Sequence, residues 1–227
     1  MTKLAEIRTY ALSKLGKLDK VTPYPADSLA ALQGRVPGSM IDMLHTLGLG
    51  TWGKGKWKTV EPQSYDGLLQ QTLRGDPDFS AGDCTAFAIL GFGDLTCWHR
   101  RFGIVNIRVL PNTLSAPSFY ENGPEDTEQA ALMNFMSIHL TAGQYYDKYA
   151  GDGKGLFDRL VKVHGPLAPG QIFAPRLPPA IGGAVTVENF RPASAPEATA
   201  LLHQMEPFVF MDHRKPRAVE VRMIGRQ

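Results

Sequence analysis

The chain has few of the residues that mark secreted or membrane-spanning proteins. It has two cysteines in 227 residues, Cys84 and Cys97, and neither belongs to a CxxC pair. We expect both to be buried thiols in a reducing compartment. No run of about 18 apolar residues is present that could span a bilayer. The first 20 residues alternate charged with apolar side chains, unlike a signal peptide. The sequence therefore predicts a cytoplasmic protein without membrane contact.

Motifs that carry catalysis are also missing from the sequence. None of the six histidines stands in a recognised metal-ligand arrangement. Ser39 lies in a Gly-Ser-Met context and not in the G-x-S-x-G of a nucleophile elbow. The paired carboxylates lie in polar loops, where nothing raises a carboxyl pKa towards neutrality. We therefore predict a protein that is not an enzyme and that holds no metal and no cofactor.

A glycine-rich segment, residues 48–57, imitates a phosphate-binding loop without its context. Its glycines fit G-x-G-x-x-G and most of a P-loop motif. A phosphate cradle needs a strand before it and a helix after it, so that free N–H groups point at the anion. Here an expected helix precedes the segment and an expected strand, Lys56–Val60, follows it. We predict no nucleotide site, and a structural loop around Trp52 and Trp57.

The net charge is small, at +2, but the charges are segregated along the chain. Residues 61–100 hold six acids against two bases, and residues 121–128 hold four acids and no base. Basic residues cluster instead at 54–58 and at 214–226. A solvated face is the ordinary explanation of such runs. The sharper hypothesis is a negative patch that steers a basic partner into contact.

Residues 87–107 are the densest run of strand-forming residues. The short apolar segments Phe87–Leu90, Leu95–Trp98 and Phe102–Ile107 are separated by turn sequences at Gly91–Asp94 and His99–Arg101. This pattern predicts three antiparallel strands joined as a meander. Such a sheet needs cover on its apolar face, which amphipathic helices on both sides in sequence can provide. The predicted fold class is α+β, with an antiparallel meander sheet covered by helices.

Helices are predicted where apolar residues recur at spacings of three and four. These segments are residues 3–16, 27–33, 39–47, 62–75, 127–140, 154–163 and 194–205. Ser39 and Ser194 are the expected N-caps of two of them, and a further strand is expected at Ala184–Phe190. Residues 110–124 carry no apolar periodicity, which favours a boundary there. We therefore expect domains at 1–120 and 121–227, the second smaller and richer in helix.

Two blocks of the sequence resemble a known pair of bacterial domains. Residues 37–117 resemble a GAD-like domain through GTWGKGKWKTVEPQSYDGLLQQTL and AFAILGFGDLTCW, where the Gly-Asp-Leu turn into an aromatic strand is the most specific feature. Residues 131–212 resemble the companion domain that often follows it, through KVHGPLAPGQIF, PAIGGAVTVENF and the leucine helix ATALLHQM. Proteins with this combination are similar to immunity proteins of type VI secretion systems, especially those that guard against a DNase effector.

The resemblance implies a protein that binds and neutralises a cognate toxin inside the producing bacterium. Its partner would be the toxin's nuclease domain, with no direct contact to nucleic acid. An immunity protein needs a complementary surface and no catalytic machinery, which agrees with the missing motifs. The alternative is a regulatory scaffold or adaptor of the cell-wall-assembly-regulator kind, whose members share a similar small α+β body.

The acidic runs are where we expect a nuclease to make contact, because proteins that handle DNA are usually basic at the DNA-binding surface. Acids would steer the encounter, and aromatic residues in polar loops would anchor the complex. The predicted steering acids are Asp76, Asp78, Asp83, Glu121, Glu125, Asp126 and Glu128. The predicted anchors are Phe79, Phe119 and Tyr120, with the loop that holds Trp52 and Trp57 as the alternative contact.

Overall fold

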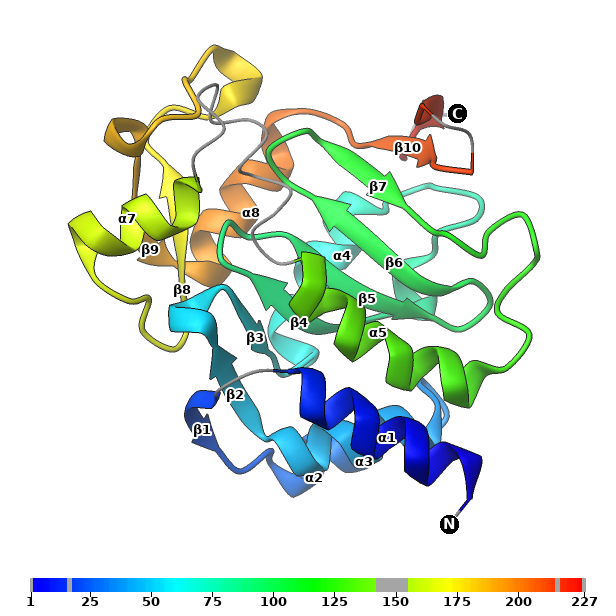
Figure 1. The fold of residues 1–227 in the computed structure, drawn as a ribbon. Helices are drawn as coiled ribbons and strands as arrows, with labels where there is room; N and C mark the ends of the chain where they lie inside the picture. Colours follow the sequence, from blue (N-terminus) through cyan, green and yellow to red (C-terminus); the bar gives the residue numbers. More distant parts are fainter. Residues whose placement is uncertain (1, 16–17, 142–154, 215–216, 226–227) are drawn as a thin grey trace.

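The centre of the protein is one twisted, nine-stranded sheet (Figure 1). The computed structural model describes residues 2–15, 18–141, 155–214 and 217–225. In sheet order the strands are β1 (Leu18–Thr22), β2 (Leu49–Trp52), β3 (Trp57–Thr59), β4 (Cys84–Leu90), β5 (Leu95–His99), β6 (Gly103–Arg108), β7 (Thr113–Ser115), β10 (Val209–Asp212) and β11 (Val219–Met223). All neighbours are antiparallel except β7 and β10, which are parallel. The predicted α+β class is confirmed.

Helices cover both faces of this sheet. One face carries α1 (Lys3–Lys14), α3 (Gly38–Leu47) and α5 (Thr127–Thr141), with the short α2 (Ala26–Ala30) beside α3. The other face carries α4 (Gln63–Thr72) and α8 (Ala195–Met205), which pack on each other. Within the described residues, none of these helices is long and apolar enough to cross a bilayer.

The predicted meander is confirmed as β4, β5 and β6, with turns at the expected places. Every residue of β4 and β5 is buried, because helices lie on both faces and not on one. A register shift between Ala86 and Ala88 inserts Phe87 as a bulge. Because of the bulge, Phe87 and Ala88 both face the α5 side, where the ring of Phe87 lies 5.2 Å from that of Phe135.

A cluster of aromatic rings joins the later part of the chain to the meander. There β8 (Gln171–Pro175) and β9 (Phe190–Ser194) form a separate two-stranded sheet next to α7 (Leu156–His164). Phe92, from the turn between β4 and β5, lies 5.9 Å from Phe157 and 5.5 Å from Phe190. Because these edge-to-face contacts are buried, they fix this small sheet against the turn.

The structure corrects the prediction of a strand at Ala184–Phe190. The strand begins at Phe190 instead, and residues 187–189 form a single 3-10 turn. Asn189 explains the difference, because its side chain donates to the carbonyls of Leu177 and Ala184 and so closes the preceding loop. The partner strand β8 lies in the proline-rich segment 166–183 that precedes β9.

Strands from both sides of the predicted boundary at residue 120 belong to the central sheet. β7 lies inside residues 110–124, where we expected the boundary, and it pairs with β10 from the C-terminal part. The two-domain division stays a prediction, but the hydrogen-bonded sheet runs continuously past it.

Both cysteines are free, buried thiols, as predicted. They lie on neighbouring strands, Cys84 on β4 and Cys97 on β5. Burial raises the pKa of the Cys84 thiol to about 12 and that of Cys97 well above its usual value. Both therefore stay protonated at neutral pH and are poor nucleophiles.

Candidate functional site

Three loops meet at one end of the meander and bring the two acidic runs together. We call this surface the loop end and define it as residues 76–83, 99–103 and 116–126. The backbone N–H of Arg100 donates to the carbonyl of Asp83 at 3.0 Å, and the Arg101 side chain donates to Asn122. These contacts place the 76–83 loop and the 116–126 loop on either side of the 99–103 turn.

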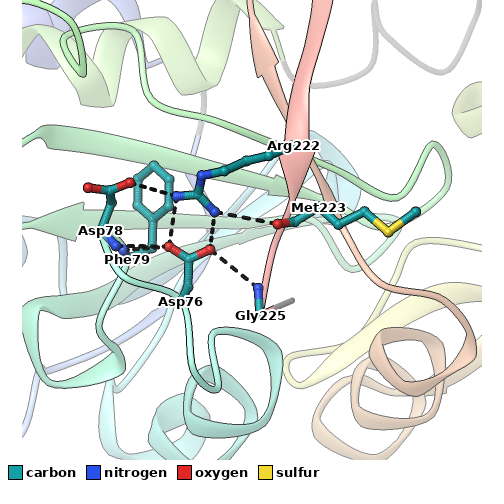
Figure 2. A network of polar contacts seen from close by, with 6 residues as sticks. All are labelled: Asp76, Asp78, Phe79, Arg222, Met223 and Gly225. Carbon is teal, nitrogen blue, oxygen red and sulfur yellow. Dashed lines mark hydrogen bonds and ion pairs between the residues drawn. The ribbon is translucent and has the colours of Figure 1, made fainter. Parts of the chain in front are cut away.

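Asp76 lies at the centre of a buried polar network in the loop end (Figure 2). Its carboxylate accepts the backbone N–H groups of Asp78, Phe79 and Gly225 at 2.9–3.3 Å. The guanidinium of Arg222, on β11, donates to Asp76 at 2.9 Å and to Asp78 at 2.8 Å. The side chain of Asp76 is 0% exposed. Asp76 therefore joins β11 to the 76–83 loop, and its prediction as a steering acid is wrong.

Hydrogen bonding decides the ionisation of Asp76. Burial alone would raise the pKa of this carboxyl group, but the hydrogen bond from Arg222 and three backbone N–H groups outweigh it and lower the pKa. Asp76 is therefore a carboxylate at neutral pH. Asp78 is half-buried and shares the same arginine, so it too is already paired.

Phe79 is part of the core and not an exposed anchor, which corrects the prediction. It is 0% exposed, and its ring lies 5.2 Å from Phe210 and 5.6 Å from both Phe102 and Phe119. Phe119 is half-buried in the same cluster. The polar neighbours of Phe79 in sequence had suggested exposure, but Asp76 and Asp78 turn inwards to reach Arg222.

Tyr120 is the predicted anchor that does reach the surface, with 42% of its area exposed. The guanidinium of Arg214 lies 3.4 Å from the centre of its ring. Asp212 holds Arg214 in place through two side-chain hydrogen bonds of 2.9–3.0 Å. The sequence prediction did not include Arg214. This stacked pair offers an aromatic edge and a cation at the border of the loop end.

The remaining acids of the loop end differ in their exposure and in whether their carboxylates already have partners. Asp83 is half-exposed and lies 3.9 Å from Arg100. Asp126 accepts the backbone N–H of Gln129 at 3.0 Å and so caps the first turn of α5. Glu121 and Glu125 are exposed, and no side-chain hydrogen bond or ion pair holds them among the described residues. These last two acids and Asp83 are the ones available to a partner.

Glu128 has a structural role instead of the predicted steering role. It projects from α5 to the start of α3, where its two carboxylate oxygens accept the backbone N–H groups of Gly38 at 3.1 Å and Ser39 at 2.7 Å. The hydroxyl of Ser39 donates to the carbonyl of Glu128 at 2.8 Å. Ser39 is therefore not the N-cap, which is Pro37. A carboxylate 89 residues away in sequence caps the helix in its place.

Replacing Glu128 by alanine is expected to lower the free energy of unfolding by about 1–2 kcal/mol, because two N–H groups of α3 lose their acceptor. Urea unfolding followed by circular dichroism measures this change. Glu125→Ala is the matched control, since that side chain is exposed just before α5, and we expect no change for it. Equal stability of the two variants would contradict the capping role.

The alternative contact at Trp52 and Trp57 is also wrong, because both side chains are in the core. They are 2% and 1% exposed, and their rings stack with centroids 4.0 Å apart and planes 4° apart. The glycine-rich segment has the surroundings that we predicted: helix α3 precedes it, and strands β2 and β3 flank its turn. A phosphate cradle would need a helix after the segment.

In the described part of the chain, no three His, Cys, Asp or Glu side chains are grouped to hold a metal ion.

Comparisons with known proteins agree with the resemblance noted in the sequence. Residues 6–110 match the GAD-like domain model, and residues 143–206 match the model described as T6SS immunity protein Tdi1, C-terminal. A solved structure, the crystal structure of Atu4351 from Agrobacterium tumefaciens, is similar with a TM-score of 0.86 and 27% identity. The match covers 100% of this chain and 99% of that one. Comparison with curated proteins gives no match. The chain is thus similar to a GAD-like domain in its N-terminal part and to the C-terminal part of the T6SS immunity protein Tdi1 in its C-terminal part.

Proposed function

We propose that this protein is an immunity protein that binds a type VI secretion toxin and blocks it. The match of residues 143–206 to the C-terminal domain of the immunity protein Tdi1 carries the proposal. The GAD-like match over residues 6–110 supports it, since the two domains form the pair expected from the sequence. Neither match favours the alternative of a regulatory adaptor.

We propose further that the toxin is a DNase and that it contacts the loop end. Asp83, Glu121 and Glu125 give this surface carboxylates that face solvent. A nuclease binds DNA phosphates with basic side chains, so it carries the complementary charge. Tyr120 stacked under Arg214 supplies a large aromatic surface next to these acids. Aromatic and arginine side chains are the commonest anchors of protein interfaces.

Co-expression tests the function directly. A candidate type VI secretion effector from a reading frame adjacent to this gene is expressed in a heterologous bacterium, with and without the chain. Because the proposed mechanism is binding, we expect the chain to restore growth and to co-purify with the toxin domain. A catalytically inactive toxin serves as the control for expression load. Toxicity that persists at full expression of the folded chain would contradict the proposal.

A further inference from the structure

A cavity of about 530 Å³ lies on the sheet face beside α4, at the end of the sheet that β1, β2 and β3 form. Strand residues form its floor, the first turn of α4 forms one wall, and Pro169, Gly170 and Pro196 form another. We call this cavity the β1–β3 groove. Its volume is in the range of small-ligand sites, which is roughly 300–1,000 Å³. It also lies between residues of the GAD-like match and residues of the Tdi1 match, and ligand sites are frequent at such junctions.

The floor of the groove carries a cross-strand row of polar side chains. Lys20 pairs with Thr51, and Thr51 pairs with Lys58. Residues paired in register point to the same face of a sheet, and all three line the groove. The neighbouring floor residues Leu49 and Val60 are apolar. Two lysines therefore lie on one side of a largely apolar cavity.

Lys58 is the unusual member of this row, because it is 4% exposed. Its ammonium donates one hydrogen bond, to the carbonyl of Gly55 at 3.1 Å. An ammonium has three N–H donors, and no other acceptor for it is found among the described residues. A buried lysine is costly unless its charge is paired. The groove therefore has room for an anion next to a cation that lacks a counter-charge.

None of the other charged or titratable groups that line the groove pairs with the ammonium of Lys58 among the described residues. Glu61 lies at the start of the α4 wall, and its carboxylate already accepts the Ser28 hydroxyl at 2.7 Å. Tyr65, on α4, is neutral at physiological pH, and burial together with the charge of Glu197 raises its pKa further. Lys20 adds a second positive charge at the open side. A ligand that complements the groove therefore carries one negative charge and an apolar group.

We propose that the β1–β3 groove binds a small amphiphilic carboxylate, with its carboxylate against Lys58 and its apolar chain against Leu49, Val60 and the proline wall. This site is separate from the loop end and does not depend on toxin binding. Apolar surface in the groove supplies affinity, and the lysine selects an acid over a neutral molecule of the same shape.

Octanoate is the probe for this site, and titration calorimetry on the full chain is the measurement. We expect saturable binding with one site per chain, and binding at least tenfold weaker for Lys58→Met. Methionine keeps the apolar volume of the lysine stem without the charge, so the fold is preserved. Lys162→Met removes an exposed lysine from α7 and is expected to bind octanoate like the native chain.

Octanol separates the charge from the apolar chain in the native protein, without any substitution. It should bind at least tenfold more weakly than octanoate. Equal affinities for octanol and octanoate would overturn the proposal, as would absence of saturable octanoate binding or an unchanged affinity in Lys58→Met. The circular dichroism spectrum of Lys58→Met, compared with that of the native chain, checks that the variant is folded.

The affinity for octanoate should also depend on pH. Burial lowers the pKa of Lys58 to about 7, and octanoate pairs with the charged form. Affinity is therefore expected to fall up to about tenfold per pH unit above that value. Lys20, Glu61 and Tyr65 are identical in the native chain and in Lys58→Met, so the difference between their pH profiles isolates Lys58. Identical profiles would overturn the proposal.

Discussion

Replacing Arg222 by methionine is expected to destabilise the protein by about 3 kcal/mol, near the lower end of the cost of leaving a buried charge without its partner. The substitution leaves the fully buried Asp76 carboxylate without its arginine and frees Asp78 as well. Arg222 itself is 26% exposed, so solvent weakens the pair somewhat. Chemical unfolding measures the effect. It is expected to appear as a lower denaturant midpoint with a similar slope.

The effect of Arg222→Met should depend on pH in a defined direction. The folded-state pKa of Asp76 lies below its usual value, which is about 3.9 in an unfolded chain. The pair therefore contributes its full stability above about pH 4, and loses it as the pH falls through the folded-state pKa. The stability difference between native and variant chains should shrink accordingly in acid.

Arg217→Met is the matched control, because Arg217 is an exposed arginine shortly before β11. We expect it to unfold like the native chain. A cost below about 0.5 kcal/mol for Arg222→Met, the level of an ordinary surface substitution, would contradict the structural role of the Asp76 network.

Reversing the three available acids of the loop end, as Asp83→Lys, Glu121→Lys and Glu125→Lys together, is expected to slow association with the toxin about tenfold or more at low salt. Charged rims mainly change association rates, because they steer the encounter. The native rate should fall steeply with added salt, and the rate of the reversed variant should not. Stopped-flow or surface-based kinetics measures both.

A second triple reversal controls for the change in total charge. Glu6, Asp27 and Asp42 are exposed acids on α1, α2 and α3, far along the chain from the loop end. Reversing them changes the net charge equally, and we expect at most a small decrease in the association rate. If the two triple variants associate equally fast, the contact does not lie at the loop end.

Local patterns in the sequence were sufficient for the meander and for most helices. The segments of β4, β5 and β6 are rich in β-branched and aromatic residues, and turn residues separate them. The strands β2 and β7 are short, with four and three residues, and the pairing of β7 with β10 is a long-range contact. A strand of three residues such as β7 has no periodicity that can be recognised.

The candidate surface could be predicted only in part, for a similar reason. The sequence correctly placed Tyr120 and Glu121 at the surface, because polar turn residues surround them. It wrongly predicted exposure for Asp76, which pairs with Arg222, 146 residues further along the chain, and for Phe79, which packs against Phe210. Glu128 likewise caps a helix 89 residues before it. Composition reveals which residues are charged, and the fold decides which of them are already paired.

Titration of the purified toxin domain with this chain tests the central claim most directly. The predicted result is a one-to-one complex with a nanomolar dissociation constant, together with complete loss of DNA cleavage once the chain is equimolar with the toxin. A complex without any effect on DNA cleavage would contradict the DNase assignment. Absence of binding at micromolar concentrations of both folded proteins would contradict the account as a whole.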